Sequence, residues 1–336
     1  MLQAGHNPRE KKSVLQGIHN RDFQGTLPFP CCRFFAFDTR NVICVDADDA
    51  VLERAREEAL RIHDAFNRFS PESEVSRMSA AAARGEDAEI SCSPDMIAVL
   101  QVCLALHGET GGAFDPTVGM SACAKPDFGG DAVAFCRGGR EQSVSTGGFS
   151  HVRISSDGLV RIPKGMGFDF GGIAKGYAAE RAVTVLSQAG ATRGFVNFGG
   201  TIAVLGPEAP DSAWVFGLQK AGAEYGGDFC ALIDAAWGAF ATSAGYFRDS
   251  SSGGRVRSHI IDPRTGVSVD NGVAEVTVHC QSATLADALS TALFVMGPAS
   301  GLLLAGDLGA EALFSMRDGS VKASPGFPAR ILGGCE

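Results

Sequence analysis

Hydrophobic and polar positions in the first part of the chain alternate first with a strand period and then with a helical one. Residues 33–46 predict two paired strands, and Asp48 or Asp49 can cap the helix that follows. Along this helix apolar side chains recur at steps of three and four: Leu52, Ala55, Ala59, Ile62, Phe66 and Phe69. The pattern therefore predicts a strand pair followed by a helix with one buried face.

Further along the chain the same two periods return. Ser93-Pro94 is typical of a helix start, and Ile97, Leu100 and Leu104 continue the apolar pattern toward Gly111-Gly112. A hairpin is predicted around Asp157-Gly158 within Val152–Ile162, and an amphipathic helix between Ser282 and Gly297. Strand-like runs lie at Ala213–Gln219, Ala239–Thr242, Val256–Ile261 and Ala274–Cys280. Strands and helices without strict alternation predict an α+β fold.

Composition narrows the class of protein. The chain has 336 residues, 45% hydrophobic and 20% charged, as expected for a globular protein with a packed core. A net charge of −9 argues against nucleic acid as a partner, and no apolar run reaches the roughly 18 residues of a membrane span. The polar N-terminus lacks a signal-type core, so a cytoplasmic location is expected, with the ten scattered cysteines as reduced thiols. Residues 1–32 read as a tail or arm, and residues 33–336 as the folded domain.

One segment, Phe168–Gly206, carries the clearest chemical signal. Asp169 precedes Gly171-Gly172, Lys175 follows, a helical run ends at Gly190, and a strand ends at Gly199-Gly200. Glycines at the start of a helix let an anion approach its free N–H groups. The spacing matches neither a Walker A loop nor a dinucleotide fingerprint. A phosphate site and a purely structural turn with a surface lysine both remain open.

Three other places could contribute chemistry. Asp287 and Thr291 lie one helical turn apart and could hold a hard cation such as Mg²⁺, or form a solvated polar face. His259 comes before the Asp-Pro-x-x-Gly turn of residues 262–266; it could orient a phosphate or exchange a proton, or be a hydrogen-bonded rim residue. Residues 111–117 display an aromatic and a carboxylate after a helix, or simply end that helix.

Taken together and in order, these segments resemble the ApbE family, the FAD:protein FMN transferases. The similar runs are SPESEVSRMS (70–79), GAFDPTVG (112–119), DFGGIAKGYAAE (169–180), FVNFGG (195–200), ATSAGY (241–246), HIIDPRTG (259–266) and ADALSTALFVMG (286–297). The resemblance extends from residue 33 to near the C-terminus. It implies a two-lobed, ApbE-like (T-fold-like) α+β fold of mixed or antiparallel sheets with flanking helices, and FAD bound between the lobes.

The resemblance also implies an activity and its site. FMN would pass from FAD to a Thr or Ser hydroxyl of an acceptor protein that carries a flavinylation motif, with Mg²⁺ at the pyrophosphate and AMP released. The implied metal ligands are Gly172, Asp287 and Thr291, and the implied catalytic residues are His259, Asp287 and Lys175. The implied FAD contacts are Phe37, Phe69, Ser73, Glu74, Ala113, Phe114, Asp115, Asp169, Lys175, His259 and Ile260. The base stays open between His259, Asp262 and the metal itself.

Several positions depart from the family pattern. Phe37-Asp38 replaces a Met-Gly, Ser79 replaces an asparagine, Thr201 replaces an aspartate, and Thr-Ser-Ala-Gly (242–245) replaces Thr-Ser-Gly. None of these changes touches the pair Asp287 and Thr291, so transfer is the leading hypothesis. The alternatives are an FAD pyrophosphatase that yields FMN and AMP, and an FAD-binding protein without turnover.

Overall fold

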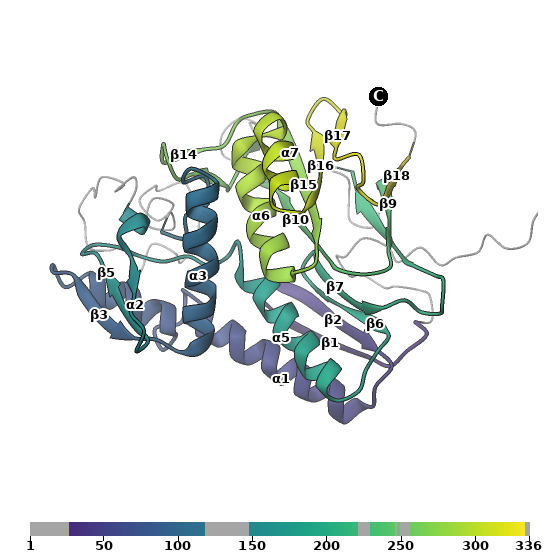
Figure 1. The fold of residues 1–336 in the computed structure, drawn as a ribbon, viewed down its shortest axis with the longest axis horizontal. Coiled ribbons are helices and arrows are strands. Elements are labelled where there is room, and N and C mark those ends of the chain that lie inside the picture. The colour runs from purple at the N-terminus through teal and green to yellow at the C-terminus, as the bar shows by residue number, and fades with distance from the viewer. Residues whose placement is uncertain (1–26, 118–147, 221–228, 246, 249–255, 333–336) are drawn as a thin grey trace, which may run out of the picture.

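The structure is a computed structural model that describes residues 27–117, 148–220, 229–245, 247–248 and 256–332 (Figure 1). Residues 1–26 of the expected arm lie outside this part, as do Val118, Gly119 and Tyr246 of the family-like runs. The first described strand begins at Cys31, slightly before the expected start of the domain.

An antiparallel sheet of eight strands forms the centre of the molecule. In spatial order the strands are β1 (Cys31–Ala36), β2 (Thr39–Val45), β6 (Gly194–Phe198), β7 (Thr201–Gly206), β10 (Ala239–Ala244), β15 (Val273–Cys280), β16 (Glu311–Met316) and β17 (Val321–Ala323). The expected pairing of residues 33–46 is confirmed as the hairpin of β1 and β2. Every residue of β15 is buried, which shows that both faces of the sheet are covered there.

Helices cover one face of this sheet, and a small sheet covers the other (Figure 1). The helices are α1 (Asp49–Phe66), α5 (Ala174–Gln188), α6 (Ala283–Met296) and α7 (Pro298–Asp307); the small sheet has the order β18 (Ala329–Ile331), β9 (Phe229–Ala235), β8 (Trp214–Gln219). Neighbouring residues of one strand serve opposite faces, as the strand period requires. Ile43 packs on the helical side and Cys44 on the side of the small sheet.

A smaller unit lies beside the large sheet and appears at the left of Figure 1. It contains α2 (Glu74–Ala82), α3 (Pro94–Glu109), the short 3₁₀ helix η2 (Gly148–His151), and the sheet β3 (Ala88–Ser91), β5 (Leu159–Ile162), β4 (Arg153–Ile154). The expected hairpin around Asp157-Gly158 is confirmed as β4 and β5. Together with the large sheet, this unit bears out the expected two-lobed α+β architecture.

Helix ends follow the capping signals of the sequence. Asp48 accepts a hydrogen bond from the amide of Val51 and begins α1, and Ser93 caps α3 in the same way. Ser282 caps α6, which ends at Gly297, but the expected amphipathic character of this helix is wrong. Because α6 lies between the sheet and other helices, it is buried nearly all round.

Three other expectations need correction. Phe69 lies beyond the end of α1 and is 61% exposed, because Asn67 leaves the helical conformation and its side chain accepts the amide of Phe69. The run Val256–Ile261 is divided between the hairpins β11 (Phe247–Arg248) with β12 (Val256–Arg257) and β13 (Ile261–Asp262) with β14 (Val267–Ser268). Ser258 bends the chain there by accepting the amide of Ile260.

The third correction concerns the buried face of α3. Leu100 is buried as expected, but Ile97 and Leu104 are half-buried at its flank. The fully buried positions are Met96, Val99, Leu100, Cys103 and Leu106. The helix is therefore rotated relative to the face that its leucines and isoleucine predicted.

Ion pairs join α1, α3 and α5. Arg61 of α1 contacts Asp95 of α3 at 2.7 Å, and Tyr177 of α5 donates to the same carboxylate at 2.6 Å. Arg181 of α5 pairs with Glu58 at 3.0 Å. These contacts fix the height and rotation of α5, the helix that carries Lys175.

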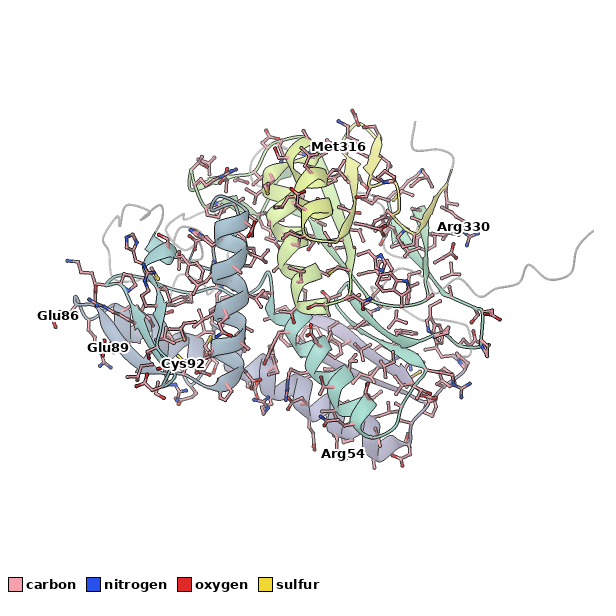
Figure 2. The ribbon with its side chains drawn as sticks, in the orientation of Figure 1. Arg54, Glu86, Glu89, Cys92, Met316 and Arg330 are labelled. Carbon is pink, nitrogen blue, oxygen red and sulfur yellow. The ribbon has the colours of Figure 1, made fainter. Side chains whose placement is uncertain are left out.

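Several charged side chains away from these ion pairs point outward. Glu86, Glu89 and Arg330 lie at the outer edges of the molecule (Figure 2). No helix in the described part of the chain is long and apolar enough to cross a bilayer. The expected cytoplasmic location stays a prediction.

Candidate active site

Asp287 is the centre of the candidate site. It lies in the second turn of α6 and is only 2% exposed, so the alternative of a solvated polar face is excluded. Its Oδ2 accepts the amide of Gly176 at 2.9 Å, and its Oδ1 accepts the hydroxyl of Thr201 at 3.2 Å. A buried carboxylate needs such partners because desolvation of its charge is costly.

Lys175 supplies the balancing positive charge. Its Nζ lies 3.2 Å from Oδ1 and 3.4 Å from Oδ2 of Asp287, and it donates to the carbonyl oxygen of Gly171 at 3.1 Å. The ammonium therefore lies against both oxygens of the buried carboxylate. The alternative of a surface lysine on a structural turn is excluded, because the Lys175 side chain points into the joint between α5 and α6.

Gly172 and Thr291 lie against each other beside this pair. A Cβ added at Gly172 would come 3.0 Å from Oγ1 of Thr291, so a larger residue would crowd the hydroxyl. Ser243 of β10 shares a hydrogen bond of 3.1 Å with the same Oγ1. The carboxylate and the hydroxyl thus lie one turn apart on α6, with the Gly172 backbone opposite.

The first glycine pair differs from what the sequence suggested, whereas the second ends a strand as expected. Gly171-Gly172 follows an irregular segment rather than a strand, while Gly199-Gly200 is the hairpin turn between β6 and β7. Positive φ angles of 58° and 97° explain the second pair. Thr201 follows this turn, and its position brings its hydroxyl to Asp287.

Asp169 marks the outer rim of the site. Its Oδ1 accepts the amide of Gly171 at 2.9 Å, and its Oδ2 pairs with Arg68 at 3.0 Å. The guanidinium of Arg68 also lies 4.7 Å from the centre of the exposed Phe69 ring. An exposed aromatic ring backed by a guanidinium offers a flat face to another ring system.

His259 precedes β13 at the same rim. Its side chain is exposed, yet neighbouring groups partly desolvate it and lower its pKa; the charge of Lys175 lowers the pKa further and that of Asp169 raises it. His259 is thus electrostatically linked to both residues and is neutral near pH 7. Asp262, the other candidate base, is bound by Arg264 through two hydrogen bonds of 2.9 Å, which lower its pKa against the effect of burial.

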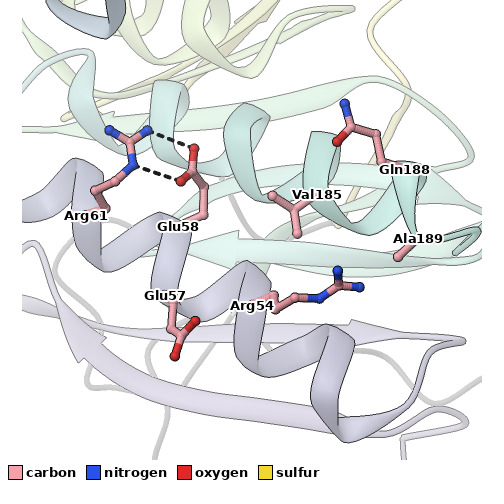
Figure 3. Close-up of a pocket in the computed structure, with 7 residues that line it drawn as sticks. All are labelled: Arg54, Glu57, Glu58, Arg61, Val185, Gln188 and Ala189. Atoms are coloured by element: carbon pink, nitrogen blue, oxygen red, sulfur yellow. Dashed lines mark hydrogen bonds and ion pairs between the residues drawn. The ribbon is translucent and has the colours of Figure 1, made fainter. Parts of the chain in front are cut away.

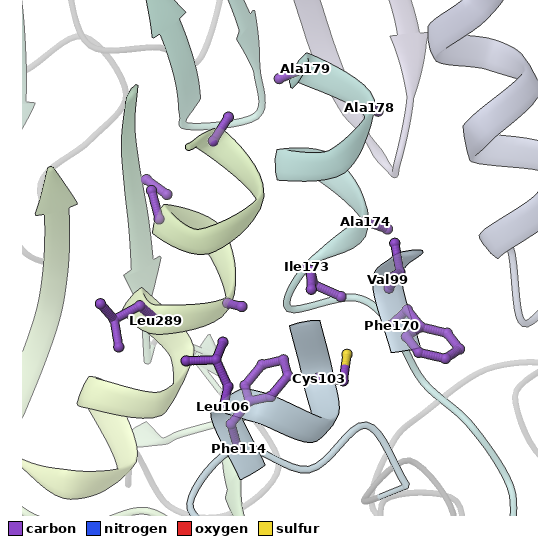
Figure 4. Packing of buried hydrophobic residues seen from close by; sticks show 14 of the residues in the cluster. Val99, Cys103, Leu106, Phe114, Phe170, Ile173, Ala174, Ala178, Ala179 and Leu289 are labelled. Carbon is purple, nitrogen blue, oxygen red and sulfur yellow. The ribbon is translucent and has the colours of Figure 1, made fainter. Parts of the chain in front are cut away.

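Residues 113–115 lie in the turn after α3. Ala113 and Phe114 are both buried in the main hydrophobic core. Figure 4 shows Phe114 in the same part of this core as side chains of α3, Ile173 and Leu289. Asp115 accepts the amide and hydroxyl of Thr117 at 2.7 and 2.5 Å. This turn shares the hydrophobic core with Ile173, the residue before α5. A direct contact of residues 113–115 with FAD stays a prediction, as it does for the buried Ile260.

The remaining expected FAD contacts have structural partners. Ser73 caps α2, and Glu74 accepts both the amide and the hydroxyl of Ser93 at 2.6 Å, which joins α2 to the start of α3. Phe37 and Asp38 form the β1–β2 turn with φ angles of 55°, and the Phe37 amide donates to Nδ1 of His63. Their contact with FAD is likewise untested.

The donor set is suited to a small hard cation. Within the described residues no three His, Cys, Asp or Glu side chains cluster as a metal site. The available oxygens are instead one buried carboxylate, the hydroxyl of Thr291 and the backbone of Gly172. Mg²⁺ commonly takes one or two carboxylates and fills its other positions with water and substrate phosphate. The Lys175 ammonium already shows that a cation fits against Asp287.

Four residues of the site were not assigned a role from the sequence: Arg68, Glu180, Thr201 and Ser243. Glu180 of α5 accepts the amide and hydroxyl of Thr284 and the hydroxyl of Ser282, and so fixes the start of α6. Ser243 and Thr201 lie within or beside the family-like runs, which was the available signal. Arg68 is adjacent to Phe69 but had no signal of its own.

A separate groove of about 500 Å³ lies between α1 and α5. It is lined by Arg54, Glu57, Glu58, Arg61, Val185, Gln188 and Ala189 (Figure 3). None of the candidate site residues lines it.

Fold and site together define an α+β protein whose buried carboxylate and lysine meet between two helices. Comparison with known proteins agrees with that class. The chain belongs to the ApbE family, whose model matches residues 37–314.

Named relatives of the chain share most of its length. An FAD:protein FMN transferase of Treponema pallidum is 29% identical over 284 residues, which cover 76% of this chain and 75% of the relative. One of Rhodobacter capsulatus is 31% identical over 283 residues, 81% of this chain and 51% of the relative. The crystal structure of the ApbE protein of Thermotoga maritima has a TM-score of 0.76 and 30% identity, covering 88% of this chain and 97% of that one.

Proposed function

We propose that this protein transfers FMN from FAD to a threonine or serine hydroxyl of an acceptor protein and releases AMP. The observation that supports it most is the buried Asp287 with Lys175 against both carboxylate oxygens and Thr291 one turn away. The names of its relatives, FAD:protein FMN transferases, point to the same reaction.

In this reaction the acceptor hydroxyl oxygen forms a bond to the phosphorus on the FMN side of the pyrophosphate. The bond from that phosphorus to the bridging oxygen breaks, and AMP leaves with that oxygen. Charge develops on the phosphate oxygens, so catalysis depends mainly on cations and N–H groups placed around them. Lys175 is the cation that this chain supplies.

Asp287, Thr291 and the Gly172 backbone are the groups that would hold Mg²⁺. When bound, Mg²⁺ would neutralise negative charge on the pyrophosphate oxygens. Lys175 would then move from the carboxylate toward the phosphates, since its flexible stem ends in a single charge. Thr201 and the Gly176 amide, which donate hydrogen bonds to Asp287, would keep its carboxylate in place.

A general base must accept the proton of the acceptor hydroxyl. His259 is our candidate because its lowered pKa keeps the ring neutral near neutral pH. Asp262 is a poorer candidate because Arg264 holds its charge. Phe69 and Arg68 would provide the flat face for a ring of FAD at the rim.

One assay tests the proposal against its alternatives. The protein is incubated with FAD and Mg²⁺, with and without a peptide that carries an Asp-x-x-(Ser/Thr)-(Gly/Ala)-Ala-Thr sequence. We expect the peptide to gain covalent FMN while AMP is released. FMN and AMP formed equally with and without the peptide would identify a pyrophosphatase, and tight FAD binding without products would identify a binding protein; either result contradicts transfer.

A further inference from the structure

Cys31 and Cys44 face each other across the β1–β2 hairpin, far along the strands from the turn. They are register partners, and both side chains lie on the side of the central sheet that the small sheet covers. Each thiol reaches the same acceptor, the carbonyl oxygen of Phe29, at 3.2 Å from Cys31 and 3.7 Å from Cys44. Both are free thiols in the structure.

Their position in the ladder is the kind that accepts a disulfide. Opposed residues of an antiparallel pair alternate between hydrogen-bonded and non-hydrogen-bonded positions. The amide of Val45 donates to the carbonyl of Pro30, so that neighbouring pair is hydrogen-bonded and Cys31–Cys44 is not. Cα atoms of non-hydrogen-bonded pairs are about 4.5 Å apart, within the roughly 4.4–6.8 Å that disulfides span.

We infer that Cys31 and Cys44 form a reversible disulfide by exchange with a low-molecular-weight disulfide such as glutathione disulfide. The Cys31 thiolate attacks one glutathione sulfur and releases one glutathione, which leaves a mixed disulfide on Cys31. Cys44 then attacks the Cys31 sulfur and releases the second glutathione. Two protein thiols are oxidised and one glutathione disulfide is reduced to two thiols, so electrons and protons balance.

The environments of the two thiols indicate that Cys31 reacts first. Cys31 is half-buried and open to a small reagent, while Cys44 is fully buried and can act only on a neighbour. The hydrogen bond from Cys44 lowers the pKa of Cys31 and Arg33 lowers it further, although burial opposes both; the pKa of Cys44 is raised. The more exposed thiol is therefore the better nucleophile.

Cys32 provides an internal control. It is the register partner of Ile43 and lies on the opposite face of the sheet, so it cannot bridge to Cys44. Its pKa is raised by burial. A reagent that simply oxidises any accessible cysteine would not distinguish it from Cys31.

The test treats reduced full-length protein with glutathione disulfide, quenches it with acid, alkylates the remaining thiols and maps the peptides by mass spectrometry. We expect a Cys31–Cys44 linked peptide, loss of two free thiols, recovery with dithiothreitol, and a higher midpoint of thermal unfolding in the oxidised protein. The link should persist in Cys32→Ser and be absent in Cys31→Ser, with circular dichroism confirming that both variants fold. Glutathione left on Cys31 without the link, or Cys31 joined to Cys32, would overturn the inference.

Discussion

Asp287 is a carboxylate with almost no solvent around it, and Lys175, Gly176 and Thr201 satisfy its charge. An uncompensated buried charge is strongly unfavourable, so such a carboxylate binds whichever cation is present. In this structure that cation is the side chain of Lys175. We propose that Lys175 competes with Mg²⁺ for Asp287 and binds phosphate when the metal is bound.

Replacing Lys175 by methionine should separate these two roles. We expect Lys175→Met to weaken FAD binding roughly tenfold or more, because a charge-assisted hydrogen bond to phosphate is lost. Mg²⁺ alone should bind this variant more tightly than the wild type, because the carboxylate is no longer occupied. Isothermal titration calorimetry measures both, with the exposed Lys322→Met as control. Unchanged FAD affinity would show that Lys175 does not reach the pyrophosphate.

The proton affinity of His259 gives a second test at this scale. Desolvation and Lys175 lower its pKa, and Asp169 raises it. We expect proton NMR of the imidazole to give a pKa below the usual value of about 6.5. Lys175→Met should raise this pKa, because a positive charge is removed, and Asp169→Asn should lower it further. An unchanged pKa in both variants would mean that His259 lies away from these residues.

The same pKa sets the direction of a pH effect. Since the folded pKa of His259 lies below its unfolded value, the unfolded state binds more protons in the interval between them. Stability from this group is complete above the unfolded pKa and falls as pH decreases through that interval. If His259 is the base, transfer should persist below pH 6.5 and decline only as the ring becomes protonated.

The residue scale also shows the limit of sequence reasoning. Asp287 and Thr291 could be recognised together because their spacing places them on one face of a helix. Arg68 could not, because it reaches the site from another part of the chain through packing alone. Ser243 was marked only by its place in the family-like run 241–246, and its contact with Thr291 depends on packing. The family resemblance implied that Glu74 contacts FAD. In the structure its carboxylate accepts hydrogen bonds from the amide and the hydroxyl of Ser93.

Two helices, α5 and α6, position the site at the scale of elements. They are in close contact at Gly176, where an added Cβ would overlap the carbonyl oxygen of Ala283 and lie 2.7 Å from Cβ of Asp287. This contact allows the amide of Gly176 to reach the carboxylate. Glu180, one turn further along α5, binds the first turn of α6.

Gly176→Ala is expected to push these helices apart. Because backbone rather than a flexible side chain is in the way, we expect a loss of about 1–3 kcal/mol in the free energy of unfolding, together with a loss of turnover. Urea unfolding and the transfer assay measure the two effects. Gly108→Ala is the matched control, since nothing lies within 4 Å of its added Cβ and it should be neutral or slightly stabilising. Equal stability of both variants would contradict the close approach.

Helix starts were predicted well because local sequence signals determine them. Which face of a helix is buried was predicted poorly, because packing against other elements determines it. The capping residues Asp48, Ser93 and Ser282 were readable because each satisfies backbone amides of its own helix. The rotation of α3 and the burial of α6 depend on neighbours that sequence periodicity does not contain. The run Val256–Ile261 is divided because the Ser258 hydroxyl accepts the amide of Ile260. This local hydrogen bond takes the place of one that a continuous strand would form.

At the scale of the whole molecule, the large sheet separates two environments. The helical face carries α5 and α6 and with them the site, while the opposite face carries Cys31 and Cys44 beneath the small sheet. Oxidation of the cysteine pair should therefore leave Asp287 and Lys175 unmoved. The overall α+β class was predictable from grouped strands and helices. Which elements cover each face of the central sheet was not predictable.

The measurement closest to the central claim is the mass of an acceptor peptide after incubation with FAD, Mg²⁺ and either wild-type protein or Asp287→Ala. We predict one covalently added FMN with the wild type and with the exposed control Asp307→Ala. With Asp287→Ala we predict an unmodified peptide, while circular dichroism shows that the variant is folded. Equal modification of the peptide by Asp287→Ala would contradict the assignment of the site, and no modification by the wild type would contradict the proposed transfer itself.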